Sequence, residues 1–274
     1  MSKKHQKKSQ GALVDIALLT GGMVEPKIFE DCLHSVCTEA ASVDSKVYVF
    51  RNGVPAETRA SYDEILQRHP VAVLQNRENR GFPLGANRVI RAGSSPLVMF
   101  VTDDVILHDG TLDKLIRRMD DPAVGICGLK LIFPADSTDK GRPAGKIQHV
   151  GHGIDVRGEI THPLIGWSPE NPKCNVSRDV ASVTGACFIV RRKVFSDTGG
   201  FFEGYGMGYY EDVDLCMEIR KLGYRVFIDT EATAIHYVGA TWAKNKIQTP
   251  MAQNRALLRQ RKGQMFTHDN WRFY

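Results

Sequence analysis

Three groups of ionisable side chains follow apolar segments of the sequence. Asp103 and Asp104 come directly after an apolar run that is typical of a strand buried on both faces. Glu211 and Asp212 begin a helical pattern that glycines precede, and His236 ends an apolar segment. Paired carboxylates bind divalent cations, and a single carboxylate can act as a general base. Together the three groups predict a metal site with a general base beside it.

Each of these residues also has a simpler explanation when it is taken alone. Adjacent Asp103 and Asp104 are typical of turns and helix caps. Asp212 near a helix start would interact favourably with the helix dipole, and a histidine at a strand end is usually a core residue. The joint occurrence of the groups favours a site, because ligands of parallel sheets bind beyond the carboxyl ends of the strands.

Strand and helix patterns alternate along the chain and position these residues. Repeated strand–helix–strand order predicts an α/β fold with a mostly parallel central sheet flanked by helices, together with a small antiparallel element. The apolar runs predict strands at 14–19, 46–50, 71–74, 97–101, 225–229 and 232–237, and a strand followed by a helix within 180–195. Helical patterns cover 27–36, 57–69, 85–93, 111–119, 211–224 and 250–262.

The segment 134–175 differs in character from its surroundings. It is rich in Gly, Pro and His and contains hairpin-like pieces. Long loops inside compact domains are usually functional, and we assign the choice of acceptor to this one. His149 and His152 lie within it, but no Glu stands between them as the H-E-x-x-H motif of zinc hydrolases requires.

Length and charge restrict the classes of protein that the chain can belong to. The 274 residues, 42% of them hydrophobic, suit one large α/β domain or two small ones. The net charge of +5 is concentrated at the two ends of the chain. We expect a basic disordered tail over 1–12 and a basic helical extension over 246–274. Such ends are usually only solvated, although they would permit weak association with an anionic membrane surface or with nucleic acid.

The sequence predicts a cytoplasmic protein, with a peripheral membrane contact through the basic ends as the variant. The apolar run near residue 14 is too short to span a membrane and contains Asp15. The cysteines lie mostly among apolar neighbours and form no C-x-x-C pair, which predicts reduced core residues and no structural zinc. They are Cys32, Cys37, Cys127, Cys174, Cys187 and Cys216.

Five segments occur in an order and spacing that resemble a known family. They are NRENRGFPLGAN (76–87), FVTDDV (100–105), VTGACFIVRRKVFSDTGGF (183–201), YYEDVDLCMEIRKLGYRV (209–226) and AIHYVGAT (234–241). The chain resembles the inverting nucleotide-sugar glycosyltransferases of family 2, including rhamnosyltransferase-like and galactofuranosyltransferase-like members. The resemblance implies a GT-A fold over 13–245, with a nucleotide-binding half at 13–104 and an acceptor-binding half at 105–245.

The resemblance also implies an activity and assigns roles to the ionisable residues. Members of the family move a sugar from a nucleoside-diphosphate sugar to an acceptor hydroxyl, here of a glycan, a polysaccharide or a glycolipid precursor. Asp212 matches the catalytic base, and Glu211 would orient the acceptor. Asp104, with His236 and Asp103, matches the site of a divalent metal, Mn²⁺ or Mg²⁺, that holds the diphosphate.

The remaining candidates line the regions of the two substrates. Aromatic faces suit sugar rings, and glycines let the backbone approach a ligand closely. For the donor the candidates are Thr20, Gly21, Arg51, Asn52, Asn79, Arg80, Gly81, Phe82, Asn87 and Asp103. For the acceptor they are Thr184, Gly185, Tyr205, Tyr209 and Trp242. The alternative for these aromatic residues is a place in the core.

The chain departs from the family pattern at two positions. Thr102 stands where relatives usually carry the first Asp of the metal motif, so the site has one carboxylate fewer. Arg51 stands where many relatives have an Asp that reads the nucleobase. Arg51 would pair with a phosphate or with a surface acid.

Other function classes fit less well. TGGMVEP lacks the G-x-G-x-x-G of nicotinamide dehydrogenases, and GRPAGKI lacks the spacing and hydroxyl of a phosphate-binding loop. Two alternatives stay open: a transferase acting on modified nucleic acid, suggested only by the basic ends, and a catalytically inactive sugar-nucleotide-binding protein, suggested by Thr102. No pattern in the sequence identifies the donor sugar, the nucleobase, the acceptor or the oligomeric state.

Overall fold

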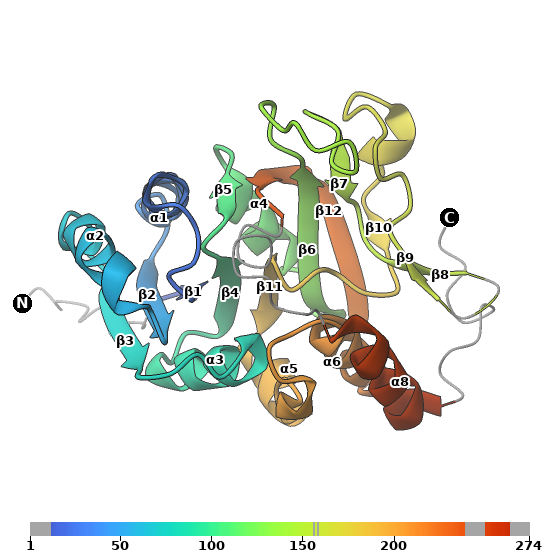
Figure 1. The fold of residues 1–274 in the computed structure, drawn as a ribbon. Coiled ribbons are helices and arrows are strands. Elements are labelled where there is room, and N and C mark those ends of the chain that lie inside the picture. The colour runs from blue at the N-terminus through green and yellow to red at the C-terminus, as the bar shows by residue number, and fades with distance from the viewer. Residues whose placement is uncertain (1–11, 156, 158, 239–249, 264–274) are drawn as a thin grey trace, which may run out of the picture.

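The computed structural model describes residues 12–155, 157, 159–238 and 250–263, and a ten-stranded sheet forms its centre (Figure 1). β5 (Val105–Leu107) pairs with β12 and β7 (Ile147–His149) with β6, beside the main path of the sheet. The main path runs β10 (Arg178–Asp179), β12 (Arg225–His236), β6 (Val124–Ile132), β11 (Cys187–Arg191), β4 (Leu97–Thr102), β1 (Val14–Thr20), β2 (Ser45–Asn52) and β3 (Ala72–Asn76).

The pairing directions confirm the predicted α/β architecture. β1 is parallel to β2 and β4, β2 is parallel to β3, and β6 is parallel to β12. β11 runs antiparallel to both of its neighbours, β4 and β6. β8 (Gly153–Ile154) and β9 (Ile160–Thr161) form the small separate antiparallel sheet.

Helices cover both faces of the sheet. One apolar cluster joins it to α1 (Pro26–Ala40), α2 (Ala56–Gln67) and α4 (Thr111–Arg118). A second joins the opposite face to α3 (Phe82–Val89), η1 (Ile90–Ala92), α5 (Arg192–Asp197) and α6 (Glu211–Lys221). α8 (Met251–Lys262) packs against α6, as Figure 1 shows, and two further short turns are η2 (Pro172–Asn175) and η3 (Glu203–Tyr205).

Alternation along β4 explains its continuous apolar sequence. Met99 and Val101 pack into the first cluster, whereas Val98 and Phe100 pack into the second. Successive side chains of a strand point to opposite faces, so a strand that helices cover on both sides needs apolar residues at every position. The first polar positions after β4 therefore lie where this cover ends.

The sequence did not predict β6, which lies in the middle of the sheet. Its segment VGICGLKLI contains glycines and a lysine that interrupt the apolar pattern. A Cβ on Gly125 would lie 2.7 Å from Cβ of Tyr224, and one on Gly128 would lie 2.7 Å from Val183. The glycines are there because side chains of the second apolar cluster occupy the space that a Cβ would need, and only the tertiary structure shows this.

The two strands predicted at 225–229 and 232–237 are a single strand, β12. Its pairing with β6 shifts register between Asp229 and Thr233. Residues 230–232 of β12 have no counterpart in β6 at this point, and such an irregularity bends a strand locally. The polar residues at the shift caused the prediction of two strands.

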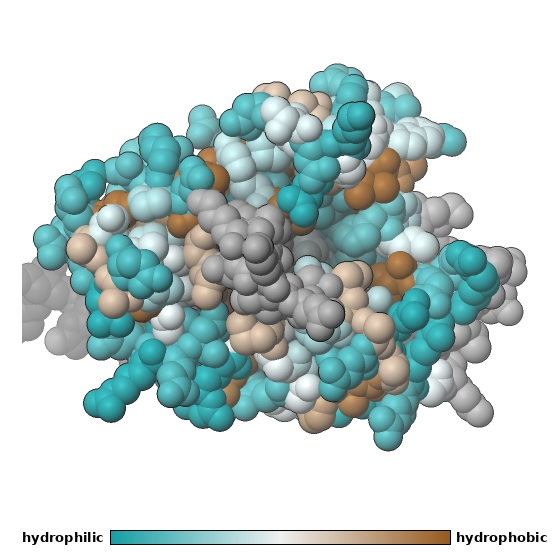
Figure 2. All heavy atoms as spheres, viewed as in Figure 1, coloured by the Kyte–Doolittle hydropathy of each residue, from teal (hydrophilic) through white to brown (hydrophobic). Residues whose placement is uncertain are grey.

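The face of the molecule drawn in Figure 2 is mainly polar. Figure 2 shows hydrophilic residues over most of one face, with apolar residues in separate small areas. Among the described helices, none combines the length and the apolar character that crossing a membrane requires. The six cysteines are free, and all but the half-buried Cys37 are buried, as the sequence predicts.

A buried ion pair ties the start of β1 to α5. The carboxylate of Asp15, 3% exposed, accepts hydrogen bonds from the backbone N–H of Ser95 at 2.9 Å and from its hydroxyl at 2.8 Å. The guanidinium of Arg192 also pairs with Asp15 and donates to the carbonyl of Ser95. The charge that interrupts the first apolar run is therefore satisfied inside the fold.

We expect Asp15→Ala to lower the free energy of unfolding by about 3–5 kcal/mol, because it leaves the charge of Arg192 without its partner. Urea unfolding measures this change. Asp113→Ala removes an exposed pair with Arg117 and should cost less than about 0.5 kcal/mol. Equal losses in the two variants would contradict the importance of the buried pair.

Candidate active site

Strand pairing brings the predicted residues to one edge of the sheet. β1, β2 and β4 run parallel and end at Thr20, Asn52 and Thr102. The antiparallel pairing of β5 with β12 places His236 opposite the residue that follows Asp104. Residues far apart in the sequence therefore meet beyond the carboxyl ends of the strands, as the sequence predicts for a ligand site.

The two ring nitrogens of His236 lie near two different oxygen atoms, one of Asp104 and one of Gln148. His236 Nε2 lies 3.5 Å from Oδ1 of Asp104, and Nδ1 lies 3.2 Å from Oε1 of Gln148. An amide oxygen only accepts, so Nδ1 donates to Gln148, and Nε2 is the nitrogen that faces the carboxylate. A histidine ligand held through its other nitrogen is typical of metal sites. The donor set fits a divalent cation between the two side chains.

Asp103 and Asp104 are buried side by side but differ in protonation. Burial and the charge of Asp104 raise the pKa of Asp103 to about 8, and the hydroxyl of Thr20 donates to Asp103 at 2.5 Å. Burial would also raise the pKa of Asp104, but His236 and Thr102 outweigh it and hold that pKa below its usual value. A cation at this edge would replace the proton of Asp103 as the balancing charge.

Thr102 supports the neighbouring carboxylate. Its hydroxyl donates to Oδ1 of Asp104 at 2.6 Å, and its backbone N–H donates to the carbonyl of Ala186 at 2.9 Å. The residue that replaces the first acid of the family motif thus orients the last acid, Asp104. One carboxylate is missing, but the remaining one is held in place.

Four of the donor candidates, Asn52, Asn79, Arg80 and Gly81, form one hydrogen-bonded group. The side chain of Asn52 donates to Oδ1 of Asn79 at 3.0 Å and to the carbonyl of Gly81 at 2.9 Å. Its own oxygen accepts from the N–H of Arg80, and a Cβ on Gly21 would lie 3.0 Å from Nδ2 of Asn79. The loops after β1, β2 and β3 therefore meet at this point.

The start of α3 joins the donor group to the second half of the chain. Gly81 has φ 88°, and a Cβ there would lie 1.8 Å from the carbonyl oxygen of Gly206. The backbone N–H of Phe82 donates to the carbonyl of Met207, and its ring lies 3.5 Å from where a Cβ of Gly185 would stand. Only glycine permits this approach at position 81.

Two donor candidates, Arg51 and Asn87, use their side chains within the protein. Arg51 pairs with Asp63, which is the surface acid that the sequence left as one alternative. Asn87 donates to the carbonyl of Phe201 at 2.8 Å and accepts from the N–H of the same residue at 2.9 Å. In this structure Arg51 fastens α2 to the sheet, and Asn87 fastens α3 to the segment after α5.

Asp212 is positioned by two backbone N–H groups. Gly185 donates to Oδ2 and Val213 donates to Oδ1, both at 2.8 Å, while the carboxylate stays partly exposed. The neighbouring Glu211 is buried, and its Oε2 has no hydrogen-bond partner among the described residues. An unsatisfied buried oxygen of this kind is typical of a group that awaits a ligand.

The two acids hold their protons more tightly than usual. Burial and the charge of Asp212 raise the pKa of Glu211 to about 8. Burial also raises the pKa of Asp212, although the backbone N–H groups and His162 act in the opposite direction. The N–H groups of Gly185 and Val213 stabilise the ionised form of Asp212, whereas Oε2 of Glu211 has no such donor, so Asp212 is the better placed of the two to act as a general base.

The loop before α6 is held in a strained conformation. Tyr209 and Tyr210 have φ values of 75° and 74°, which side chains other than glycine rarely adopt. Nδ2 of Asn254 lies within hydrogen-bond distance of the carbonyls of Tyr205, Gly208 and Tyr209, at 2.9, 2.7 and 3.2 Å. The sequence offered no signal for Asn254, because its contacts lie some 45 residues away along the chain.

α8 confirms the predicted helix at 250–262, but its basic side chains are paired within the protein. Arg261 and Lys262 contact Asp214 at 2.6 and 2.8 Å. Asp214 also accepts from the hydroxyl of Tyr205, which is 1% exposed. These contacts fix α8 to α6 and leave less free positive charge than the composition suggests. The other pairs of α8 are Arg255–Glu159, Arg259–Glu159 and Lys262–Glu218.

The acceptor candidates fall into different environments. Thr184 and Gly185 lie beside Asp212, and Tyr209 is half-buried in the strained loop. The ring of Tyr205 packs in an apolar cluster with α6 and α8, which is the core alternative for that residue. Trp242 lies outside the described residues.

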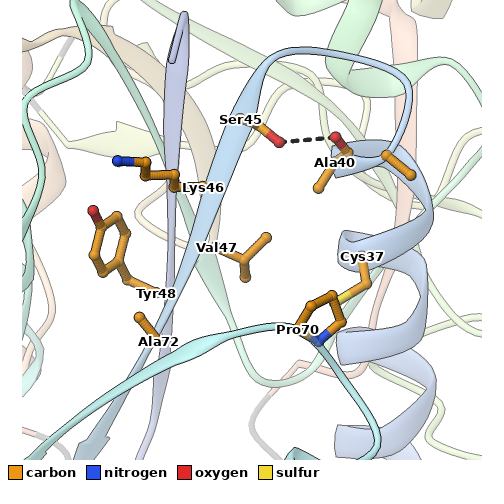
Figure 3. A pocket seen from close by; sticks show the side chains of 9 residues that line it. Cys37, Ala40, Ser45, Lys46, Val47, Tyr48, Pro70 and Ala72 are labelled. Carbon is orange, nitrogen blue, oxygen red and sulfur yellow. Dashed lines mark hydrogen bonds between the residues drawn. The ribbon is translucent and has the colours of Figure 1, made fainter. Parts of the chain in front are cut away.

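A pocket at the opposite end of the sheet is separate from these residues. It has a volume of about 390 Å³ and lies between the end of α1 and the start of β2 (Figure 3). Cys37, Val47 and Pro70 contribute to its lining, and the hydroxyl of Ser45 donates to the carbonyl of Ala40 at its rim. It holds none of the ionisable residues singled out in the sequence.

The raised pKa of Glu211 predicts a pH-dependent effect of Glu211→Gln on stability. The folded state binds the proton of Glu211 more tightly than the unfolded state does. The contribution of Glu211 to the free energy of unfolding is therefore lost as pH rises from about 5 towards 8. We expect the unfolding free energy of the variant, relative to the natural protein, to increase by up to about 1.4 kcal/mol per pH unit. Urea unfolding in EDTA at pH 5 and pH 8 tests this. A difference between the two proteins that does not change with pH would contradict it.

Several curated proteins are similar to this chain. The O-antigen biosynthesis protein RfbC of Myxococcus xanthus is 32% identical over 168 residues, which cover 58% of this chain and 12% of that protein. The N-acetylglucosaminyl-diphospho-decaprenol L-rhamnosyltransferase of Mycobacterium tuberculosis is 28% identical over 197 residues, covering 63% of this chain and 61% of that protein. The chain thus spans less than two thirds of the length of these relatives.

Solved structures with low sequence identity share the fold. GalNAc-T7 with UDP, GalNAc and Mn²⁺ matches with a TM-score of 0.63 and 10% identity, over 92% of this chain and 55% of that one. The mannosyltransferase PcManGT from Pyrobaculum calidifontis, in complex with GDP-Man and Mn²⁺, matches with a TM-score of 0.59 and 15% identity, over 91% of this chain and 70% of that one. These likenesses confirm the GT-A glycosyltransferase fold.

The family model described as glycosyl transferase family 2 matches residues 24–199. This range is more than half of the chain, and it contains the donor group, the acids after β4 and the Thr184–Gly185 segment. The chain belongs to glycosyl transferase family 2.

Proposed function

We propose that the protein is an inverting, metal-dependent glycosyltransferase. It would move a sugar from a nucleoside-diphosphate sugar to a hydroxyl of a glycan, a polysaccharide or a glycolipid precursor. One observation supports the proposal most directly. The carbonyl of Ala186 accepts a hydrogen bond from the backbone N–H of Thr102, which lies beside the Asp104–His236 pair. The N–H of the preceding residue, Gly185, donates a hydrogen bond to Asp212. A cation site and a general base are thereby held by neighbouring peptide groups.

Asp104 and His236, with Asp103, would hold the divalent cation. When bound, that ion would neutralise the charge that develops on the departing nucleoside diphosphate. Carboxylate oxygens with one imidazole suit Mn²⁺ as well as Mg²⁺. The presence of Mn²⁺ with UDP or GDP-Man in the two structures of similar fold supports this assignment.

Asp212 would take the proton of the acceptor hydroxyl as its oxygen attacks the anomeric carbon. The N–H groups of Gly185 and Val213 hold the carboxylate in one orientation, and attack from the face opposite the diphosphate would invert the configuration. The unsatisfied oxygen of Glu211 would accept a hydrogen bond from the acceptor. General base catalysis contributes about 10²–10⁴ in rate.

The two substrates would bind on opposite sides of the backbone segment formed by Gly185 and Ala186. We assign the donor to the group around Asn52, Asn79 and Gly81, and the acceptor to the side of Thr184 and Tyr209. The rhamnosyltransferase name of one relative supports a deoxyhexosyl donor over a hexosyl donor. We retain 13–245 as the transferase domain, divided after Asp104.

The two alternatives have less support from the structure. Thr102 orients Asp104, so its presence does not favour an inactive sugar-nucleotide-binding protein. The basic residues of α8 are paired with acids, so that helix does not favour nucleic acid as an acceptor. Thermal-shift measurements with a panel of nucleoside diphosphates, with and without Mn²⁺, test the class and identify the base together.

We expect Asp212→Asn to lower transfer by at least about 10²-fold, because the amide cannot accept the proton. Binding of the nucleotide selected by the thermal-shift panel should stay within a few-fold of the natural value. Isothermal titration calorimetry and a product assay measure the two quantities separately. Normal turnover in this variant would contradict the assignment of Asp212 as the base.

We expect Asp104→Ala and His236→Ala each to remove the Mn²⁺-dependent part of nucleotide binding, because each deletes a ligand of the ion. The thermal shift given by nucleotide with Mn²⁺ should then equal the shift without it. Asp109→Ala, an exposed acid of the following loop, is the matched control and should keep the response. If both site variants respond to Mn²⁺ like the control, the metal lies elsewhere.

A further inference from the structure

Three histidines outside the proposed machinery converge beside it. His149 ends β7, His152 precedes β8, and His162 follows β9. One ligand atom from each lies within 4.8 Å of the others. The centroids of their rings are 4.5 to 5.6 Å apart, and each pair of rings meets edge to face. Sequence motifs gave no such site, because the third histidine lies on a different hairpin strand.

The spacing of the ring nitrogens fits coordination of one ion. In a tetrahedral zinc site with bonds of about 2.1 Å, ligand nitrogens stand about 3.4 Å apart. Nδ1 of His149 and Nδ1 of His162 are 3.5 Å apart. Nδ1 of His152 lies 2.7 Å from the hydroxyl of Ser182, which leaves its Nε2 for the cluster and supplies the outer partner typical of a ligating histidine.

The three imidazoles are uncharged at neutral pH. Burial lowers the pKa of His152 to about 4. The ring of His162 is desolvated among its neighbours although part of the residue reaches the surface, and this desolvation, together with His152, lowers the pKa of His162 to about 3. Burial and the neighbouring histidines hold the pKa of His149 well below its usual value. Neutral imidazole is the form that binds metals, so the cluster offers lone pairs without first losing protons.

We propose that His149, His152 and His162 form a zinc site separate from the oxygen-rich site at Asp104. Three nitrogen ligands favour Zn²⁺ or Co²⁺, whereas carboxylates favour Mn²⁺ and Mg²⁺, so the two sites select different ions. His149 and His152 are buried and His162 is exposed, which leaves the fourth coordination position open on the side of His162.

Metal binding through Nδ1 of His149 has a structural consequence. Its Nε2 now accepts the N–H of Thr184 over a long 3.3 Å contact. Binding moves the ring proton from Nδ1 to Nε2, with no net proton released, and ends this contact. Thr184 precedes Gly185, which holds Asp212, so the ion would adjust the segment that positions the proposed base.

The test uses metal alone and needs no sugar nucleotide, so it stands apart from the proposed function. The full chain, stripped with EDTA, is titrated with Co²⁺ in excess Mg²⁺. We expect one equivalent to bind with the intense visible absorption of four-coordinate cobalt, and Zn²⁺ to displace it. His162→Ala changes an exposed residue, so it should fold like the natural protein, and it should weaken binding at least tenfold.

Two control variants make the outcome decisive. Asp104→Ala should leave the cobalt spectrum unchanged, and so should His34→Ala, which removes an exposed histidine of α1. Loss of the spectrum in Asp104→Ala would assign the ion to the other site and overturn the proposal. Equal binding by His162→Ala and the natural protein, or no binding by either, would leave a hydrogen-bonded histidine cluster and would also overturn it.

Discussion

The site depends on the short backbone segment before β11. Ala186 accepts a hydrogen bond from Thr102 at the end of β4, and Gly185 donates one to Asp212 at the start of α6. These bonds join the edge of the sheet that we propose as the cation site to the helix that carries the proposed base. β11 can do this because it runs antiparallel to β4, so its beginning lies beside the end of that strand.

Buried negative charge is the second constraint. Asp103 lies beside Asp104, and Glu211 lies beside the half-buried Asp212, so each pair places two carboxyl groups close together with little solvent around them. Burial and the charge of the neighbouring acid raise the pKa of Asp103 and of Glu211. A cation would balance the first pair. Such pairs reduce stability, so their presence at one edge of the sheet is evidence of a functional site.

The parts predicted well from the sequence are those with strong local signals. β1, β2, β4 and α6 have the expected positions because their apolar periods match a strand or a helix. β6 was missed, because Gly125 and Gly128 replace apolar residues where Tyr224 and Val183 press against the strand. Asn254 was missed for a related reason: its partners are carbonyl groups of a distant loop, and backbone carbonyls leave no mark in a sequence.

The sequence by itself determined the family, the alternation of strands and helices in the first half of the sheet, and the acids at the strand ends, because these follow from residue types at fixed spacing. Only the tertiary structure decided which polar side chains face a site and which are used within the fold. Arg51 and Asn87 hold elements together, whereas Asp212 remains partly exposed. The cluster of His149, His152 and His162 is likewise visible only in the tertiary structure. Its members meet through hairpin packing and strand pairing, which fix distances in space that separation along the chain does not encode.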